Sequence, residues 1–234
     1  MDVHGNAGYC TICDQPSYFV ERGAWLRDQY VCLRCNSVPR ARALMLLVQL
    51  TCPDWRTQDV YESSPAAALS AKLSNDSGSY TWSHFVPTQP RGSVVDNLRS
   101  ENLECLTFED EQFDIVITQD VFEHVLRPDL AFREIARVLR PGGRHVFTVP
   151  LYQRPTTLVR ATPGPDGPLL SLPAEYHGDP VNENGSLVVR EWGDDIVDFV
   201  KEHSDMDTER HAFSDRQLGL DGEFLDVLVS AKAP

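Results

Sequence analysis

Four of the six cysteines fall into two pairs, each with two residues between its members. The pairs are Cys10 with Cys13 and Cys32 with Cys35, and eighteen residues separate them. Two such pairs at this interval can bring four thiolates into the tetrahedron that Zn²⁺ prefers. Disulfides are the alternative, but two such pairs in a chain without a recognisable secretion signal favour a metal. The segments 18–20 and 25–26 have the composition of short strands, so residues 1–40 are predicted to form a zinc ribbon stabilised by its metal.

The predicted ribbon has a structural rather than a catalytic metal. Four thiolate ligands leave no open coordination position, so we assign it no chemistry. Three arginines follow its last strand and are either solvated or able to steer an acidic substrate: Arg34, Arg40 and Arg42. Cys52 and Cys105 have no partner at a useful spacing, and both are predicted to be buried thiols.

Polar residues in the middle of the chain form a second candidate site, and its position depends on the elements around it. Residues 113–118 alternate large apolar and small side chains, as in a buried strand. A helix is predicted from about Asp129 to the Pro-Gly-Gly turn at 141–143, and residues 145–149 form the next strand. Strand, helix and strand in this order predict a parallel sheet covered by helices.

Ligands of such sheets bind beyond the carboxyl ends of the strands. Gln119, Asp120 and His124 follow the strand at 113–118 and are therefore predicted to line a binding crevice. Asp120 either contacts a ligand or caps the turn, and Glu123 is expected to face away and support the turn. His124 is a base, a ligand contact or a packed structural histidine.

Length and composition limit the possible functions. A chain of 234 residues can hold one full domain and a small appendage. The net charge of −14 disfavours non-specific nucleic-acid binding. No signal peptide and no apolar run of membrane-spanning length is recognisable, so a cytoplasmic protein without membrane association is expected.

The sequence FDIVITQDVFEHV, followed by FREIARVLRPGG, resembles the core of the class I S-adenosylmethionine-dependent methyltransferases, in particular the small-molecule type 11 group. The resemblance covers about residues 55–150. It implies a Rossmann-like α/β fold over residues 41–234, with seven strands in the order 3-2-1-4-5-7-6 and closing strands near 206–213 and 223–231. It also implies S-adenosylmethionine as cofactor and a small-molecule methyl acceptor as partner.

The resemblance further implies cofactor contacts after the first strand. An acidic residue and a glycine-rich turn lie there in the family; Glu62 matches the acidic residue and Ser63 begins the turn. The usual glycines align with Ser64, Ala66 and Ala68. Small side chains preserve the close approach of the backbone, but a Cβ discourages the positive φ that glycine permits.

Other cofactor contacts are assigned by the same resemblance. The family's ribose-binding acid is replaced by Ser83 or His84, either of which can accept one hydrogen bond. Asn102, in a segment at 102–108 that resembles the third strand, would accept a hydrogen bond from the adenine amine, unless it only holds a turn. Leu103 would contact adenine through its backbone. The resemblance makes His124 architectural or cofactor-side rather than the base of the reaction.

Residues 151–190 contain many prolines and glycines and are predicted to be an insertion on the substrate side. Within it, Tyr176 and His177 are candidates for a general base or an orienting donor. A polar surface loop is the alternative.

Two other functions compete with methyl transfer. A methyltransferase-like scaffold without glycines in its turn and without the ribose-binding acid could be a non-catalytic binding module whose zinc ribbon docks a partner. A nucleotide-dependent oxidoreductase is disfavoured, because no G-x-G-x-x-G follows the first strand.

Overall fold

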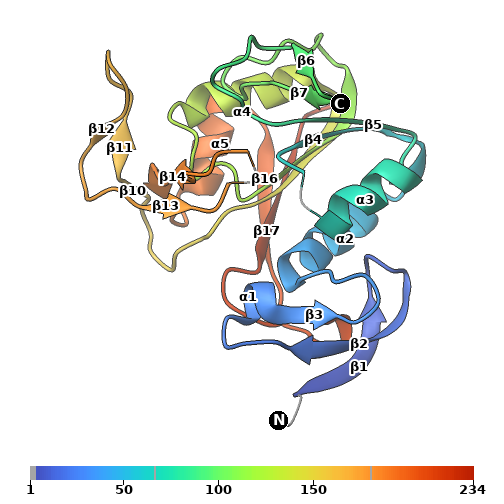
Figure 1. The fold of residues 1–234 in the computed structure, drawn as a ribbon. Coiled ribbons are helices and arrows are strands. Elements are labelled where there is room, and N and C mark those ends of the chain that lie inside the picture. Colours follow the sequence, from blue (N-terminus) through green and yellow to red (C-terminus); the bar gives the residue numbers. More distant parts are fainter. Residues whose placement is uncertain (1–3, 66, 180) are drawn as a thin grey trace.

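The protein is described by a computed structural model that covers residues 4–65, 67–179 and 181–234 (Figure 1). At its centre lies a six-stranded mixed sheet in the order β16-β17-β9-β8-β4-β5. The four strands from β5 to β9 pair in parallel, and β17 and β16 complete one edge as an antiparallel hairpin. The strands are Asp59–Ser63 (β4), Ser79–Ser83 (β5), Phe113–Gln119 (β8), Leu139–Thr148 (β9), Asp207–Ala212 (β16) and Asp226–Ala231 (β17).

The sheet divides the hydrophobic core into two clusters because successive side chains of a strand point to opposite faces. In β8, Ile115 and Ile117 belong to one cluster and Val116 belongs to the other. Helices α2 (Pro39–Thr51) and α3 (Ala67–Asp76) cover the first face. Helices α4 (Pro128–Val138) and α5 (Ile196–Ser204) cover the second, as Figure 1 shows.

The predicted doubly wound α/β architecture is confirmed, but its third strand is not found in the described residues. Segment 102–108 is irregular, and that edge of the sheet has only an isolated parallel bridge between His84 and Ser100. Side-chain oxygens accept hydrogen bonds from the backbone N–H groups of this segment. Asn102 Oδ1 accepts one from the Glu104 N–H at 2.9 Å, and the Glu134 carboxylate accepts one from the Leu106 N–H at 2.8 Å. A small hairpin of Val94–Val95 (β6) and Leu98–Arg99 (β7) precedes the bridge.

The N-terminal residues form a three-stranded antiparallel sheet of Gly5–Cys10 (β1), Gln15–Glu21 (β2) and Tyr30–Cys32 (β3). The strand predicted at 25–26 is absent: Leu26 begins a helical turn, Leu26–Gln29 (α1), that precedes β3. This N-terminal module packs into the first core cluster through side chains such as Phe19 and Tyr30.

Arg42 connects the N-terminal module to the sheet domain and is fully buried, which contradicts its interpretation as a solvated charge. Its guanidinium donates to the carbonyl oxygens of Tyr30 (2.7 Å), Gly219 (3.1 Å) and Ser37, and lies 4.6 Å from the centre of the Phe19 ring. A buried charge needs such a set of acceptors, so the arginine fixes the module rigidly. Arg34 is exposed.

The predicted insertion consists of short two-residue strands between longer loops. It lies beside the ends of α4 and α5 (Figure 1). Its strands are Leu158–Val159 (β10), Ala161–Thr162 (β11), Leu169–Leu170 (β12), Tyr176–His177 (β13), Ser186–Leu187 (β14) and Arg190–Glu191 (β15). Short 3-10 helices are found at Trp55–Thr57 (η1) and Arg216–Leu218 (η2). Among the described residues, no helix combines the length and apolar character that crossing a bilayer requires.

Candidate active site

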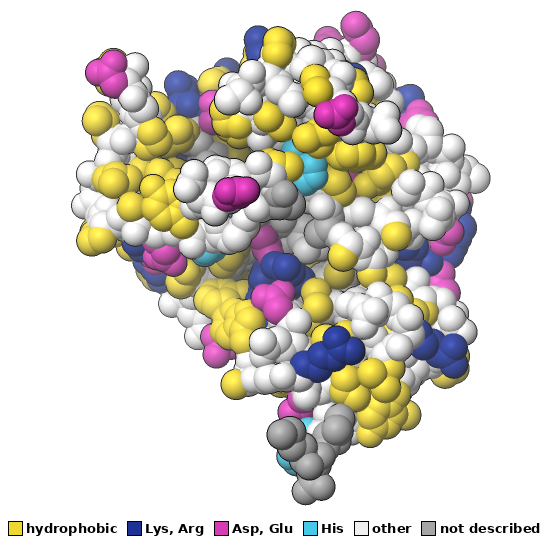
Figure 2. All heavy atoms as spheres, in the orientation of Figure 1, with side chains coloured by type: hydrophobic (Ala, Val, Ile, Leu, Met, Phe, Trp, Pro, Cys, Tyr) yellow, Lys and Arg dark blue, Asp and Glu magenta, His cyan; other side chains and the backbone are white. Residues whose placement is uncertain are grey.

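A cavity of about 900 Å³ lies at the carboxyl ends of the parallel strands. Residues that follow β4, β5, β8 and β9 reach it, as do α1 and the insertion. Figure 2 shows this face hollowed above the N-terminal module. The cavity receives nine of the predicted site residues: Ser63, Ser64, His84, Asn102, Leu103, Gln119, Asp120, His124 and His177.

The turn after β4 has a left-handed backbone conformation, although it lacks the glycines that favour this conformation. Ser64 has a φ of 59° and Ala67 a φ of 49°. The Ser64 N–H donates to the Ser83 carbonyl at 2.8 Å, which holds the turn against β5. A non-glycine residue in this region costs on the order of 1 kcal/mol. Ala66, the middle position aligned with a family glycine, lies outside the described residues.

Two residues predicted to bind cofactor lie away from the cavity. Glu62 is fully buried, and its carboxylate accepts from Ser70 Oγ at 3.0 Å and from the Tyr80 hydroxyl. Burial raises the pKa of Glu62 to about 7, against the opposing effect of these two donors. Ser83 is also fully buried and pairs with the Tyr61 hydroxyl at 2.7 Å.

His84 takes the position at the end of β5 instead. It lines the cavity, and burial lowers the pKa of its imidazole, an effect that Asp179 partly opposes. The ring is therefore neutral near pH 7 and keeps one nitrogen as a hydrogen-bond acceptor.

Gln119 and Asn102 present amide groups to the same space. Gln119 is 8% exposed, and its Oε1 finds no hydrogen-bond partner in the part of the chain that the structure describes. Asn102 Oδ1 accepts a hydrogen bond from the Glu104 N–H and so holds a turn, as the alternative interpretation of the sequence expected. The residue nevertheless also lines the cavity. A carbonyl oxygen has a second lone pair, so the turn does not exhaust its capacity as an acceptor.

The Asp120 carboxylate is occupied by two arginines of the N-terminal segment. Arg27 Nη2 donates to its two oxygens at 2.7 and 2.8 Å, and Arg40 Nη1 donates at 2.6 Å. Thr148 Oγ1 adds a hydrogen bond at 2.9 Å. Burial favours the protonated acid, but the two guanidinium groups outweigh it and hold the pKa of Asp120 below its usual value. Arg40 is therefore paired rather than free to steer a substrate.

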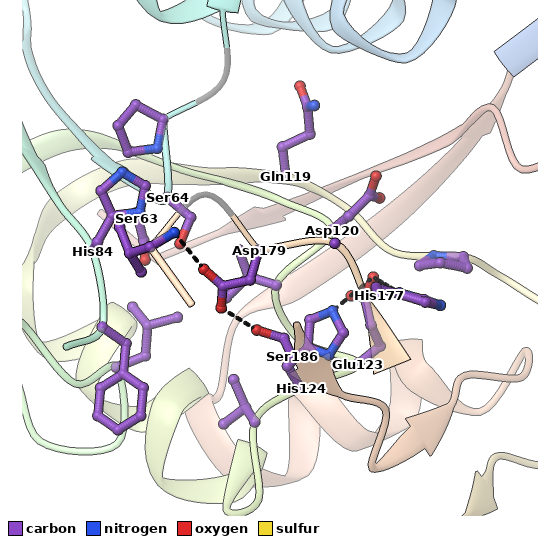
Figure 3. Close-up of a pocket in the computed structure, with 18 of the residues that line it drawn as sticks. Ser63, Ser64, His84, Gln119, Asp120, Glu123, His124, His177, Asp179 and Ser186 are labelled. Atoms are coloured by element: carbon purple, nitrogen blue, oxygen red, sulfur yellow. Dashed lines mark hydrogen bonds and ion pairs between the residues drawn. The ribbon is translucent and has the colours of Figure 1, made fainter. Parts of the chain in front are cut away.

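Glu123 faces the cavity, contrary to the expectation that it points away. It is 1% exposed, and neither carboxylate oxygen has a hydrogen-bond partner among the described residues. Its Oε1 lies 3.8 Å from His124 Nε2 and 3.8 Å from His177 Nδ1. Figure 3 shows these three side chains close together on one side of the cavity, with Ser63, Ser64 and His84 on the opposite side. We call them the histidine–carboxylate cluster.

Only one of the two predicted catalytic residues reaches the cavity. His177 is half-buried within it, and the nearby Glu123 carboxylate raises the pKa of its imidazole. Tyr176 is 57% exposed and does not line the cavity. This outcome follows from the period of a strand, since neighbouring residues of β13 point to opposite sides.

Several lining residues were not identified from the sequence. Three aromatic side chains form one wall, with Phe224 6.2 Å from Trp25 and 5.1 Å from Tyr152 between ring centres. Asp179 also lines the cavity, where Ser186 donates to its carboxylate (Figure 3). These residues come from segments distant in sequence, and no local pattern signals their meeting. Glu123 could have been identified, because it adjoins His124.

The four predicted metal-binding cysteines meet in the N-terminal module. Their Sγ atoms all lie within 4.8 Å of one another, and the pairs Cys10–Cys35 and Cys13–Cys32 are each separated by 3.8 Å. A zinc tetrahedron with bonds of about 2.3 Å spaces its sulfurs by about 3.8 Å, so the donor set fits this ion. Cys52 is buried as predicted, whereas Cys105 is exposed.

Comparisons with known proteins agree with this geometry. Residues 80–147 match a family described as a methyltransferase domain. A ubiquinone biosynthesis O-methyltransferase of Roseobacter denitrificans is 33% identical over 92 residues, which are 39% of this chain and 36% of that protein. The chain thus matches about a third of the length of that relative.

Two solved structures share the fold at low sequence identity. An S-adenosylmethionine-dependent methyltransferase of Mesorhizobium loti has a TM-score of 0.50 and 16% identity, over 81% of this chain and 97% of that one. A putative S-adenosylmethionine-dependent methyltransferase of Listeria monocytogenes has a TM-score of 0.50 and 9% identity, over 83% and 100% of the two chains. The chain therefore has the Rossmann-like fold of these two methyltransferases, and its residues 80–147 match the methyltransferase-domain family.

Proposed function

We propose that this protein transfers the methyl group of S-adenosylmethionine to a small-molecule acceptor. The observation that carries the proposal is the cavity at the carboxyl ends of β4, β5 and β8, in a chain with a methyltransferase-domain match. Its volume of about 900 Å³ is near the upper end of the range of about 300–1,000 Å³ for ligand pockets. A cofactor and a small acceptor both fit in a space of this size.

The cofactor occupies the side of the cavity lined by the ends of β4 and β5. The backbone of the Ser63–Ser64 turn approaches its methionine part, and the neutral His84 ring accepts a hydrogen bond from a ribose hydroxyl. Asn102 and Leu103 border the adenine ring. Asp120 contributes indirectly, because its carboxylate is already bound by Arg27 and Arg40 and fixes the floor of the cavity.

The reaction needs little from the protein beyond position. The sulfonium makes the methyl group electrophilic; the acceptor atom forms a bond to its carbon while the carbon–sulfur bond breaks and its electron pair stays on sulfur. The protein holds the two reactants in line and excludes water.

The acceptor approaches from the side of the histidine–carboxylate cluster. His177 lies there and is the group that takes the acceptor's proton in the absence of a metal. Trp25, Tyr152 and Phe224 provide an apolar wall against which an acceptor packs. We assign no role to Tyr176, because its side chain lies outside the cavity.

We further propose that Cys10, Cys13, Cys32 and Cys35 hold a structural Zn²⁺. The two sulfur separations of 3.8 Å, and the meeting of all four sulfurs within 4.8 Å, support this assignment. The ion would join β1 to β3 and thereby keep α1, with Arg27, in place above the cavity.

Calorimetry with S-adenosylmethionine and with its demethylated product tests the proposed function. Both are expected to bind the full-length protein with one site per chain. A His84→Leu variant should bind about fivefold more weakly, because one ribose hydrogen bond is worth about 1 kcal/mol. The matched control is His4→Leu, at an exposed position outside the cavity, which should bind like the unmodified protein. If neither ligand binds, the non-catalytic scaffold is the correct interpretation.

A further inference from the structure

The histidine–carboxylate cluster brings three metal-ligating groups together at the inner wall of the cavity. One ligand atom from each of Glu123, His124 and His177 lies within 4.8 Å of the others. The two imidazole rings stand nearly perpendicular, at 89°, with their centres 5.1 Å apart. Glu123 Oε1 lies 3.8 Å from a nitrogen of each ring, so all three groups face a common point.

The Glu123 carboxylate is buried beside two imidazoles. The residue is 1% exposed, and neither oxygen accepts a hydrogen bond from the described residues. Taking an ionised carboxylate out of water costs several kcal/mol unless a charge or a donor compensates. Both imidazoles lie 3.8 Å from Glu123 Oε1, beyond hydrogen-bond distance, so a cation bound between the three groups would compensate this charge more directly.

The outer contacts of both histidines direct their free nitrogens inward. His124 Nδ1 donates to the Leu187 carbonyl at 2.9 Å, which leaves Nε2 as the nitrogen nearest Glu123. His177 Nε2 lies 4.0 Å from the Glu175 carboxylate, which leaves Nδ1 facing the same point. Metal-binding histidines characteristically donate their second nitrogen to a backbone carbonyl or a carboxylate, as His124 does to Leu187.

A bound ion requires the three ligand atoms to move closer together. Ligands at about 2.0–2.1 Å around a tetrahedral ion are about 3.3 Å apart. The two separations from Glu123, 3.8 Å each, exceed this value by about half an ångström, and the third, between the two histidine nitrogens, lies within 4.8 Å. Rotation of the three side chains would supply the difference. His177 belongs to the insertion hairpin of β13 and β14, so the approach also draws this hairpin against the core.

We propose that Glu123, His124 and His177 bind a divalent first-row transition-metal cation whose remaining coordination positions open into the cavity. Two imidazoles and one carboxylate suit Zn²⁺, Fe²⁺, Co²⁺ or Ni²⁺ better than Mg²⁺ or Ca²⁺, which prefer all-oxygen sites.

The open positions would be available to a hydroxyl oxygen of the acceptor; the cation would lower the pKa of this hydroxyl, whose proton would leave to bulk water as the acceptor binds. This role rests on the methyl transfer proposed above, whereas binding of the cation does not. With the cation bound, His177 is a ligand and not the base.

The test counts metal in full-length protein prepared with Co²⁺ as its only added transition metal. We expect the unmodified protein to bind one more divalent metal ion per chain than the Glu123→Gln variant binds. His177→Gln, in the insertion hairpin, should lose the same equivalent without risk to the core. The matched control is Glu209→Gln, at an exposed carboxylate 3.5 Å from His211 outside the cavity, which should keep the full count.

The visible spectrum identifies which site is lost. Cobalt at the cysteines gives thiolate-to-cobalt charge transfer, and cobalt at nitrogen and oxygen ligands gives only weak ligand-field bands. Glu123→Gln should lose the weak bands and keep the charge-transfer band. Equal metal counts in Glu123→Gln and the unmodified protein would overturn the proposal. Absence of S-adenosylmethionine binding together with the extra cobalt would overturn the proposed function and leave the metal site standing.

Discussion

The cysteine cluster and the histidine–carboxylate cluster differ in how their members are supplied. The four cysteines come from β1, β3 and the turns beside them within 26 residues, and two of their sulfur pairs already have the separation of a zinc tetrahedron, 3.8 Å. The second cluster joins two residues after β8 to a histidine of an insertion 53 positions later in the chain. It offers three ligands and opens into a cavity.

The two proposed metal sites would therefore have different roles. A set of four thiolates saturates its ion and can only stabilise the fold, whereas three ligands leave positions for a substrate. The cysteine cluster lies within a hydrophobic core cluster that it shares with the sheet domain. The second cluster contains a buried carboxylate that accepts no hydrogen bond from the described residues, a destabilising arrangement that proteins retain mainly at functional sites. Four predictions test this contrast.

Loss of the cysteine cluster should have the largest effect on stability. Replacing Cys32 by Ser removes one thiolate, and the binding free energy of a structural zinc is largely folding free energy. We expect the free energy of unfolding to fall by about 5 kcal/mol or more, measured by urea denaturation. The control is Cys105→Ser at an exposed cysteine, which should change it by less than about 0.5 kcal/mol. Similar midpoints for the two variants would show that the cluster has no stabilising metal.

Glu62 provides a second buried carboxyl group, one with hydrogen-bond partners. Its pKa is raised from 4.5 to about 7, so protonation favours the folded state. The stability it contributes is present below about pH 4.5 and is lost as the pH rises to about 7, because only the unfolded state ionises in that window. As the pH rises from about 4.5 to about 7, the free energy of unfolding of the unmodified protein should therefore fall by about 3 kcal/mol relative to that of Glu62→Gln. Denaturation midpoints at several pH values measure this; a difference independent of pH would contradict it.

Removing the charge of Glu123 should stabilise the metal-free protein, the opposite of the cysteine variant. Glu123→Gln relieves part of the cost of a buried carboxylate without donors, and we expect a gain of about 1–2 kcal/mol in the free energy of unfolding at pH 8. Glu209→Gln, on an exposed strand position, is the control and should be neutral. A clear loss of stability in Glu123→Gln would make the second cluster structural, like the first.

The smallest expected effect concerns the turn after β4. Ser64 has a φ of 59°, which glycine adopts without strain, so Ser64→Gly should stabilise the protein by up to about 1 kcal/mol. Thermal denaturation would measure the change, which amounts to a few degrees at this chain length. Binding of S-adenosylmethionine should be maintained or improved, since the backbone keeps its shape. Weaker binding would show that the serine side chain itself contacts the ligand.

The parallel core of the sheet and the helix after β8 were predictable, because strand alternation and helical spacing are local properties of the sequence. The carboxyl ends of parallel strands meet at one edge, so Gln119, Asp120 and His124 were also predicted to reach the cavity. The third strand was not predicted correctly, because side chains of Asn102 and Glu134 replace its backbone ladder. Such substitutions depend on contacts that no periodicity records.

The sequence by itself determined the cysteine cluster, since two close pairs on a short chain segment have few ways to meet. It also determined the strand ends that line the cavity. Only the tertiary structure decided which neighbours these residues have. Asp120 meets Arg27 and Arg40, and Glu123 meets His177, across separations of 54 to 93 residues. The physical reason is that a side chain's pairing depends on packing between distant segments, and the free energy of that packing is distributed over the whole core.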